Sequence, residues 1–364
     1  MIKTMRKKPT IATVAAKAGV AVSTVSRYLN GHYVSRDVRA RLSTIIDQLG
    51  YSRSWTARNL SLGRRGSIGV VVDSSDDPWF VQLLKGIEEE LSMRDTSLML
   101  CSTALHKTYD PRIVFQWIRD HRVDGLIVAK AQRHDRALFT AAVKAQLPVV
   151  AVVPDENVRD VQVLRSNNLS GGALVADHLV NLGHRHIAFA GGPKHSIDSK
   201  HRLRGLQEQL AHRGVTLAGD DIYSCDSFEF DAGTVFAEQF LSRPLEVTAL
   251  VMANDALAFG FMHVALRRGV KIPEELSLVG FDGLPEGALV YPALTTVAQP
   301  MQEMGRVACK RLLELLGTPR RLERVEFPMH LIVRESTAQP SIGALRLQPV
   351  PRAVLSAVTP SDEA

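Results

Sequence analysis

Residues with hydrogen-bonding and basic side chains at helical spacing lie in one short stretch near the start of the chain, residues 10–30, which reads TIATVAAKAGVAVSTVSRYLN. In its second half, Val25 and Leu29 lie one helical turn apart on one face. The opposite face carries short side chains, most of them able to hydrogen-bond, and one guanidinium: Val22, Ser23, Ser26 and Arg27. A helix with such a face fits the DNA major groove, where base edges offer hydrogen-bond donors and acceptors.

The first half of the stretch predicts a second helix that supports this one. Thr10 can cap its start and Gly19 can end it. Its apolar stripe consists of Ile11, Val14, Ala15 and Ala18. A helix, a glycine turn and another helix form the layout of a helix-turn-helix motif, although similar helix pairs occur in proteins that never touch DNA.

The uneven distribution of charge favours DNA binding over that alternative. The 364 residues carry a net charge of +6, but residues 1–66 hold 13 Lys and Arg against 2 Asp and Glu, a net charge of +11. The remaining residues carry a net charge of −5. A basic head on a mildly acidic body indicates that the head alone meets a polyanion, and a phosphate backbone is the usual one.

Two further segments complete the predicted head. Ser35 can cap a third helix, whose apolar stripe runs to Leu49 and which Gly50 can end. Residues 54–60, SWTARNL, are short for a stable isolated helix, so they form either a plain linker or a helix that orders on DNA. In the second case Leu60 is the apolar wedge that enters the minor groove between base pairs.

From Ser67 the sequence alternates between apolar strands and amphipathic helices, and this rhythm runs twice. Such alternation predicts two lobes, each a parallel sheet with helices on both faces, and a cleft between them. The expected fold class is an all-α helix-turn-helix head joined by a hinge helix to an α/β domain of two lobes. The expected boundaries are 1–52 for the head, 53–66 for the hinge helix and linker, 67–340 for the two lobes and 341–364 for a flexible tail. The first lobe is expected to hold 67–165 and 296–325, and the second 166–295 and 326–340.

Polar and aromatic residues follow the predicted strands at their carboxyl ends, where ligands bind in open parallel sheets. Carboxylates, amides and an aromatic ring suit hydrogen bonding to, and stacking on, a small polyhydroxylated molecule. The residues in these positions are Asp73, Asp76, Asp77, Trp79, Phe80, Gly191, Gly192, Pro193, Asn254, Asp255 and Asp282. Trp79 lies off the helical stripe that contains Phe80, so Trp79 is the expected stacking residue and Phe80 is expected in the core.

The sequence contains no constellation typical of catalysis or of metal binding. It has no phosphate-binding lysine loop, no dinucleotide glycine fingerprint, no paired zinc histidines and no nucleophile elbow. The three cysteines, Cys101, Cys225 and Cys309, are far apart and odd in number, which indicates a reducing compartment and no structural metal. No window is apolar over the length of a membrane span. We therefore expect a cytoplasmic protein that needs no cofactor and is not an enzyme.

Several motifs resemble those of the lac repressor and galactose repressor family of bacterial transcription regulators, in ordered matches between residues 10 and 340. AGVAVSTVSRYLNG is similar to the family's helix-turn-helix signature, and ARNL at Ala57 to Leu60 is similar to its hinge helix. DDPWF resembles the segment that opens the ligand cleft. Further segments similar to family hallmarks are HLVNLGHRHIAF, VGFD, PALTTVAQP and RESTA. The resemblance implies that the two lobes have the fold of periplasmic binding proteins.

The resemblance also implies roles for particular residues. The positions that read base edges are Val22, Ser23 and Arg27, and those near phosphates are Thr10, Thr24, Ser26 and Asn30. The minor-groove hinge positions are Ala57, Arg58 and Leu60. The effector positions are Arg202, Phe228, Asn254 and Asp282, which join the cleft candidates Asp76, Asp77 and Trp79. His184, in a loop before a strand, is expected to be structural.

One departure from the family pattern concerns the recognition helix. Ala21 stands where a serine usually caps it, so the helix is expected to begin at Ser23 or to be held less firmly. In the cleft, Ser196 and Asp198 differ from the residues of purine-responsive relatives, which argues against a purine effector, and the acids and amides that line the cleft favour a sugar or sugar derivative. Asn167 replaces a common aspartate, and Gly283 stands where a polar residue is frequent.

The sequence thus predicts a repressor that binds double-stranded operator DNA and is controlled by a small effector between the lobes. The tail beyond Pro340 has no leucine heptads, so a homodimer is expected. Two other classes of protein remain as alternatives. A sugar-binding transport protein shares the two lobes but needs an export signal and no basic head. An α/β enzyme acting on a sugar needs a positioned acid, base or nucleophile in the cleft.

Overall fold

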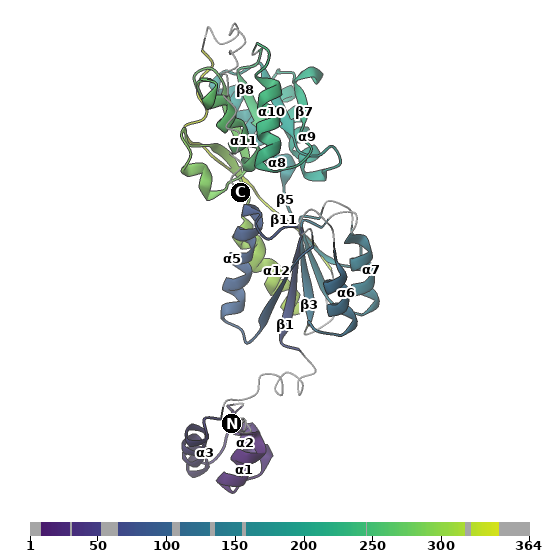
Figure 1. The fold of residues 1–364 in the computed structure, drawn as a ribbon, viewed down its shortest axis with the longest axis vertical. Helices are drawn as coiled ribbons and strands as arrows, with labels where there is room; N and C mark the ends of the chain where they lie inside the picture. Colours follow the sequence, from purple (N-terminus) through teal and green to yellow (C-terminus); the bar gives the residue numbers. More distant parts are fainter. Residues whose placement is uncertain are drawn as a thin grey trace, which may run out of the picture. The chain divides into compact units, whose positions relative to one another are not determined.

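The computed structural model describes residues 9–29, 31–51, 65–103, 110–131, 135–154, 158–244, 246–316 and 322–341. The chain forms two compact units that divide between Ser67 and Ile68. The first unit is helical, and the second contains two six-stranded sheets with helices around them (Figure 1). The predicted helical head and α/β body of two lobes are therefore confirmed. The expected hinge helix, with Ala57, Arg58 and Leu60, lies outside the described residues.

Three helices enclose the small core of the first unit: α1 (Ile11–Ala18), α2 (Val22–Leu29) and α3 (Arg36–Leu49). The Thr10 hydroxyl accepts a hydrogen bond from the Thr13 amide and so caps α1, as predicted. Gly19 ends α1 with a φ of 64°, a left-handed conformation that favours glycine. The side chains buried between the helices are those of Val14, Ala15, Ala18, Val25, Leu42 and Ile45.

The recognition helix α2 begins at Val22, so the expected start at Ser23 is wrong. The carbonyl of Ala21 accepts hydrogen bonds from the amides of Thr24 and Val25, at 2.9 and 3.3 Å. These backbone bonds begin the helix without a serine side chain as cap. Helix α3 likewise starts after Ser35 without a side-chain capping bond, and Gly50 ends it in the left-handed conformation.

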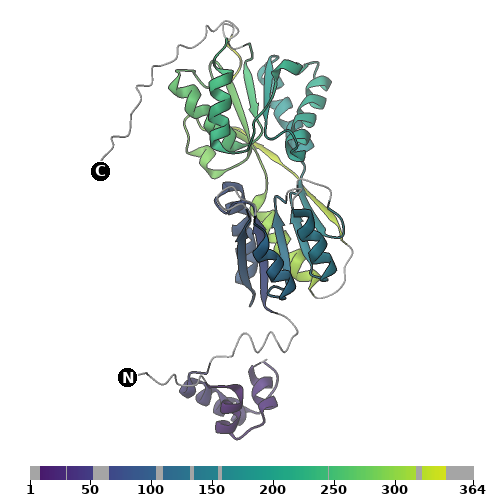
Figure 2. The same ribbon diagram turned by 45° about the vertical axis from the view of Figure 1, so that its right-hand side comes forward.

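The first sheet of the second unit has the strand order β11-β5-β4-β3-β1-β2, and the neighbours with an assigned register run parallel. Its strands are β1 (Ser67–Val72), β2 (Ser97–Ser102), β3 (Gly125–Ala129), β4 (Val149–Val152), β5 (Gln162–Ser166) and β11 (Arg324–Phe327). Helices α5 (Pro78–Ser92) and α12 (Met301–Leu315) pack on one face. Helices α6 (Arg112–Arg119) and α7 (Arg136–Lys144) pack on the other, so the sheet is covered on both sides (Figure 2).

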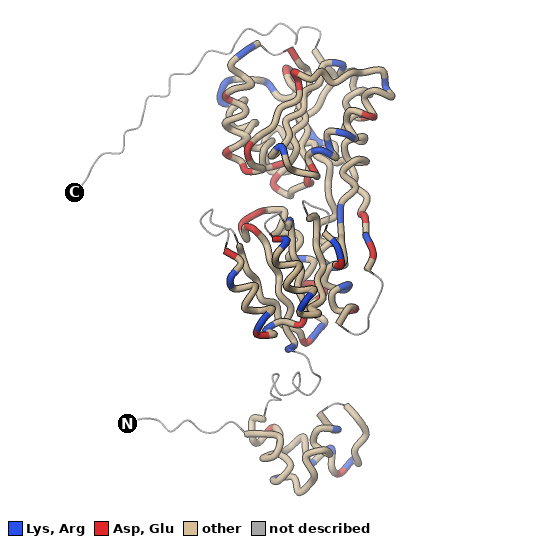
Figure 3. Tube along the Cα trace, turned by 90° about the vertical axis from the view of Figure 1, so that its right-hand side faces the viewer, with Lys and Arg blue, Asp and Glu red and all other residues tan. Residues whose placement is uncertain are grey.

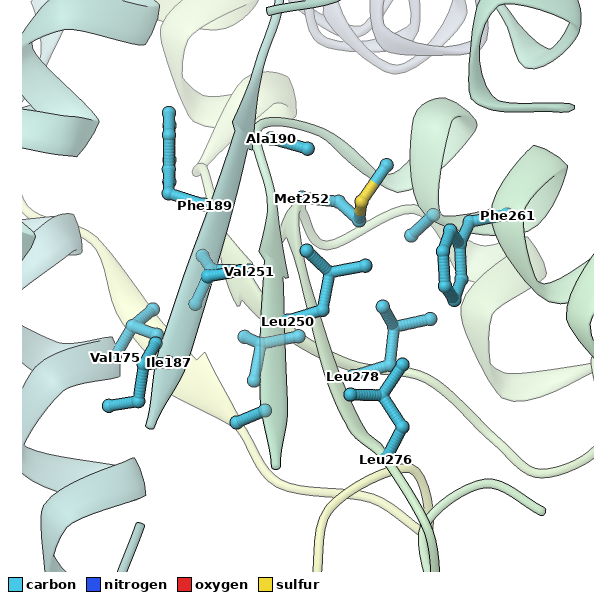
Figure 4. Close-up of a cluster of buried hydrophobic side chains, with 14 of the residues drawn as sticks. Val175, Ile187, Phe189, Ala190, Leu250, Val251, Met252, Phe261, Leu276 and Leu278 are labelled. Atoms are coloured by element: carbon cyan, nitrogen blue, oxygen red, sulfur yellow. The ribbon is translucent and has the colours of Figure 1, made fainter. Parts of the chain in front are cut away.

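The second sheet has the order β12-β10-β9-β8-β6-β7, with β12 antiparallel to β10. Its strands are β6 (Ile187–Gly191), β7 (Ile222–Ser224), β8 (Ala249–Met252), β9 (Ser277–Asp282), β10 (Thr295–Ala298) and β12 (His330–Ile332). Its helices are α8 (Asn168–Leu182), α9 (Ile197–His212), α10 (Phe230–Phe240) and α11 (Asp255–Arg267), with short 3-10 turns η3 (Gly219–Asp221) and η4 (Pro285–Ala288). Figure 4 shows the apolar side chains that fill this core, among them Phe189 on β6, Leu250 on β8 and Phe261 on α11.

The chain crosses between the sheets at positions that differ from the expected ones. Residues 296–325 were expected in the first lobe, but β10 pairs in parallel with β9 and belongs to the second sheet. The chain returns to the first sheet only with α12, and β11 extends that sheet through Phe327. Both strands have only four residues, TTVA and RVEF, so the sequence pattern alone does not reveal which sheet each one joins.

The start of helix α9 positions much of the site. Helix α9 begins at Ile197, where the Ser196 hydroxyl accepts a bond from the Ser199 amide. Helices α8 and α9 approach closely because glycines face the partner backbone. A Cβ on Gly172 would collide with the carbonyl oxygen of Arg202, and one on Gly205 with that of Leu169. Arg202 is thereby held tightly against α8.

Candidate functional site

The exposed face of α2 in the first unit presents the predicted base-reading residues to solvent. Val25 is fully buried, whereas Ser23 and Arg27 are exposed and Val22 is 46% exposed. The buried Val25 and the exposed Val22, Ser23 and Arg27 therefore lie on opposite faces of the helix, as the spacing predicted. An exposed guanidinium beside a hydroxyl and an isopropyl group can hydrogen-bond guanine and contact a thymine methyl group.

Three of the four residues predicted to lie near DNA phosphates, Thr10, Thr24 and Ser26, are among the described residues. Thr24 and Ser26 lie half-buried on α2, and the Thr10 hydroxyl is engaged with Thr13 at the start of α1. Asn30 lies outside the described residues, as do Ala57, Arg58 and Leu60. The proposed phosphate contacts and the minor-groove wedge stay predictions.

A cavity of about 110 Å³ lies between the two sheets of the second unit, and we call it the central cavity. It is several times larger than the 10 to 15 Å³ that holds a single water, by the same kind of measure. Most of its lining follows the carboxyl ends of strands from both sheets, where ligands of parallel sheets bind. The lining residues are Trp79, Lys130, Val153, Pro193, His195, Ser196, Asp198, Arg202, Phe228, Asn254, Asp282 and Gln299.

Arg202 stands at the centre of a buried polar network. It is 4% exposed, and its Nε donates to Asn168 Oδ1 at 2.8 Å. Its Nη1 donates to the carbonyl oxygen of Ala253, and its Nη2 lies 3.5 Å from Asp282 Oδ1. The guanidinium carbon is 4.9 Å from the centre of the Phe281 ring. These contacts fix the orientation of the guanidinium, which leaves one edge of it on the cavity wall.

Asp282 is held from several sides and is conformationally strained. Its φ of 113° lies in the left-handed region that disfavours residues with a Cβ, which is typical of functional positions. Gln299 Nε2 donates to its Oδ1 at 2.6 Å. Burial raises the pKa of Asp282, and the charges of Arg202 and Lys130 oppose this rise. The carboxyl group is thus preorganised to accept hydrogen bonds from a ligand.

Asp255 lies behind the cavity wall rather than on it. It is fully buried and accepts hydrogen bonds from Thr296 Oγ1 at 2.6 Å and from the Leu284 amide at 2.7 Å. Burial raises its pKa well above the ordinary value, and the nearby charge of Asp282 adds to the shift. Its bonds anchor the backbone that follows β9, so Asp255 positions Asp282 instead of touching a ligand.

Lys130 brings a charge from the first sheet into the cavity. Its ammonium group donates to Asp77 Oδ2 at 2.5 Å and lies 4.8 Å from the centre of the Trp79 ring. Burial lowers the pKa of Lys130, but the charges of Asp77 and Asp282 outweigh this effect, so the pKa is raised and the side chain stays protonated. Lys130 therefore links the first sheet electrostatically to Asp282 of the second.

Phe228 and Asn254 form the aromatic and amide part of the wall. Asn254 Nδ2 donates to the Phe228 carbonyl at 3.0 Å, while Asn254 Oδ1 accepts the Leu257 amide and caps α11. The Phe228 ring packs so closely on Gly192 that a Cβ there would overlap it. A flat apolar ring beside polar groups suits the two kinds of surface that a sugar presents.

The structure brings together five of the seven predicted effector residues: Trp79, Arg202, Phe228, Asn254 and Asp282. Asp77 does not line the cavity; it caps α5 through the Trp79 amide and pairs with Lys130. Asp76 is exposed and bonds Ser74. Trp79 lines the cavity although its side chain is only 2% exposed, and Lys130 lies over its ring, so stacking of a ligand on Trp79 stays a prediction.

Two structural predictions about aromatic and histidine side chains are confirmed. Phe80 is fully buried in the core. His184 is 1% exposed and lies between the Thr248 hydroxyl at 2.8 Å and the Ala338 carbonyl at 2.9 Å. It joins the segment near Ala338 to the second sheet.

Sequence reasoning missed several lining residues. Lys130 and Gln299 directly follow β3 and β10, so the rule of strand ends could have found them. His195 lies in the loop before α9 and was missed, whereas Ser196 and Asp198, which the resemblance placed in the cleft, do line the cavity at the start of α9. Asp198 Oδ1 accepts a bond from Asn168 Nδ2 at 3.0 Å, so Asn168 connects it to Arg202.

The described residues contain no group of three or more His, Cys, Asp or Glu side chains placed to hold a metal ion. No helix among them is long and apolar enough to cross a membrane.

Each of the two units matches a model of a known protein family. The model of the bacterial regulatory proteins of the lacI family matches residues 10–54, and the periplasmic binding protein-like domain matches residues 176–337. The regulator DegA of Bacillus subtilis (strain 168) is 30% identical over 341 residues, which cover 91% of this chain and 98% of DegA. The ribose operon repressor of Escherichia coli (strain K12) is 29% identical over 311 residues, 85% of this chain and 94% of the repressor.

Solved structures agree in fold. A complex of the transcriptional regulator CelR with cellobiose has a TM-score of 0.68 and 27% identity, covering 90% of this chain and 99% of CelR. The lac repressor dimer bound to operator and the anti-inducer ONPF has a TM-score of 0.78 and 24% identity, covering 91% of this chain and all of that chain. The chain belongs to the lacI family of bacterial regulatory proteins, as a transcriptional regulator with a helix-turn-helix unit followed by a periplasmic-binding-protein-like domain.

Proposed function

We propose that this regulator is a repressor that binds operator DNA as a homodimer and that a sugar or sugar derivative in the central cavity sets its operator affinity. The observation that carries the proposal is the composition of the cavity wall. One wall combines the Phe228 ring with the fixed polar groups of Arg202, Asn254 and Asp282. The sugar bound to CelR and the name of the ribose operon repressor support this class of ligand.

The charges in the cavity favour an uncharged effector. Lys130 is paired with Asp77, and Arg202 faces Asp282, so each of these charges already has an opposite partner. An ionised ligand would disturb these pairs and would lose its own hydration. Hydroxyl groups, by contrast, both donate and accept, and so can bond carboxylates, amides and guanidinium edges at once.

Control of DNA binding requires that the effector prefers one arrangement of the two lobes. The cavity takes Trp79 and Lys130 from the first sheet and Arg202 and Asp282 from the second, so a bound molecule contacts both. An effector with different affinities for two lobe arrangements shifts their populations by that difference. We infer that the protein acts by binding rather than by turnover, needs no cofactor besides this effector, and works in the bacterial cytoplasm at the nucleoid.

Isothermal titration of the full chain with neutral monosaccharides and disaccharides tests this proposal. We expect one of them to bind, and we expect Asp282→Asn to weaken its binding by about tenfold or more, because a hydrogen bond to a charged group contributes about 1.5 to 3 kcal/mol. Asp220→Asn, at an exposed acid in η3 of the same lobe, is the matched control and should bind as tightly as the parent. Equal affinity in both variants would refute the assignment of the cavity.

A further inference from the structure

A second hollow in the same unit has a different character, and we call it the basic groove. Its volume is about 440 Å³, and it shares no lining residue with the central cavity. Strands β5 and β11 form one side, and the first turns of α9 form the other. Its charged and ionisable lining consists of Arg165, Lys200, His201, Arg324 and Glu326.

The two strands place Arg165 and Arg324 on one face of the sheet edge, diagonally across from one another, with Glu326 directly opposite Arg165. In the parallel register Arg324 lies opposite Val163 and Glu326 lies opposite Arg165, so these side chains share one face of the sheet edge. Glu326 accepts a hydrogen bond from Asn167 Nδ2 at 3.0 Å, which occupies part of its carboxylate. Among the residues that the structure describes, neither Lys200 nor Arg324 forms an ion pair. Charged residues of both signs line the segments that pass between the sheets in Figure 3.

The groove has an excess of positive charge on both of its sides. The lining contains three cationic side chains, Arg165, Lys200 and Arg324, and one carboxylate, Glu326. Lys200 also lies in the first turn of α9, where the helix dipole adds positive potential. Lys200 belongs to the second lobe, whereas Arg165 and Arg324 belong to the first. Without an anion these charges repel one another across the groove, and an anion between them would convert the repulsion into attraction to both lobes.

We propose that the basic groove is a second ligand site, which binds a small molecule through a phosphate group. Guanidinium groups bind phosphate oxygens through paired, charge-assisted hydrogen bonds, and the lysine adds a point charge from the opposite side. The groove is roomy enough for more than the phosphate itself, so a phosphorylated metabolite fits it as well as inorganic phosphate does.

Helix α9 gives this site a route to the central cavity. Lys200 lines the groove and Arg202, two residues later on the same helix, lines the cavity. A phosphate that draws α9 toward β11 therefore acts on the helix that carries the buried Arg202 network. Coupling between two sites is reciprocal, so the phosphate ligand and the effector must change each other's affinity by the same factor. The binding claim itself does not rest on the proposed sugar effector.

Isothermal titration of the full chain with inorganic phosphate and with glucose 6-phosphate, at constant ionic strength, tests the proposal. A parallel titration with glucose, which lacks the phosphate group, is the control for binding through the sugar alone. The double variant Lys200→Gln/Arg324→Gln should bind the phosphate ligands at least about tenfold more weakly, since it removes two charge-assisted contacts. The control Lys144→Gln/Arg267→Gln removes two exposed charges that line neither hollow and should leave binding unchanged.

The other outcomes also decide the question. If glucose 6-phosphate binds more tightly than inorganic phosphate, the site recognises a phosphorylated molecule; equal affinity assigns recognition to the phosphate group alone. Asp282→Asn, which alters the central cavity, should retain phosphate binding, and this separates the groove from the effector site. Binding that both double variants lose equally, binding that both retain, or the absence of saturable binding would overturn the proposal.

Discussion

Arg202 and Asp282 face each other at the central cavity although 80 residues separate them, with Arg202 Nη2 3.5 Å from Asp282 Oδ1. Both side chains are almost completely buried. Gln299 reaches the same carboxylate oxygen from the end of β10, so elements of α9, β9 and β10 meet at one atom. Because an isolated buried charge is costly, each of the two charged groups keeps the other in place.

Arg202→Ala should lower the free energy of unfolding by about 3 to 5 kcal/mol, the usual cost of leaving one member of a buried pair without its partner. It should also abolish the response to effector. Arg204→Ala removes an exposed guanidinium two residues away that pairs with Glu208, and should cost about 0 to 1 kcal/mol. Urea unfolding of both variants compares the two costs, and equal costs would contradict the role given to Arg202.

Gly192→Ala should weaken effector binding while leaving operator binding intact. The added methyl group overlaps the Phe228 ring, which must shift away from its place in the cavity wall. Gly219→Ala is the matched control, because a Cβ there meets no atom within 4 Å. Titration with the effector should show a weaker affinity for the first variant alone, and an unchanged affinity would argue against a contact between Phe228 and the ligand.

Arg27→Ala should reduce binding to the specific operator far more than binding to unrelated DNA. A bidentate contact from arginine to guanine is worth about 1 to 3 kcal/mol of discrimination. Arg41→Ala removes the same charge from an exposed position on α3 of the same unit and should affect both DNAs alike. Fluorescence anisotropy on the two DNAs measures this ratio. A parallel loss for Arg27→Ala on both DNAs would rule out base reading by Arg27.

Acidification should destabilise the second unit in a way that depends on His184. Burial lowers the pKa of His184, so the folded state favours the neutral ring more strongly than the unfolded state does. The resulting stability is present above the unfolded pKa of about 6.5 and is lost as the pH falls through the lowered folded pKa. The pKa of His178 is lowered by burial too and contributes in the same direction.

Urea midpoints at pH values above and below this window check the pH effect. The parent chain should lose stability on acidification, and His184→Gln should lose less, because one of the two titrating rings is gone. The variant should also be less stable at neutral pH, since Ala338 and Thr248 lose a well-placed partner. An identical pH dependence in both proteins would assign the effect to other groups.

The fold and part of the site were predictable because short-range patterns determine them. The spacing of Val14, Ala18 and Val25 sets the buried face of the helix pair, and Gly19 permits the turn. Asn254 and Asp282 follow apolar strands, and the geometry of parallel sheets brings such strand ends together.

The remaining features depend on contacts that are distant in sequence. Lys130 stays in the cavity because Asp77, 53 residues away, neutralises it, and the same contact covers the Trp79 ring. The polar residues Ser196 and Asp198 look like loop residues in sequence, yet Ser196 caps α9 and Asp198 lies in its first turn, and Gly205 of α9 and Gly172 of α8 let the two helices pack closely. The sheet that each short strand joins is likewise decided by its neighbours, as β10 shows.

The most direct test of the central claim is fluorescence anisotropy of the full chain on DNA from upstream of its own gene, with and without neutral sugars. We expect tight, salt-sensitive and sequence-selective binding that one sugar shifts. We also expect Asp282→Asn to keep the DNA binding and lose the shift. DNA binding that is weak and indifferent to sequence, or a sugar response that Asp282→Asn retains in full, would contradict the account.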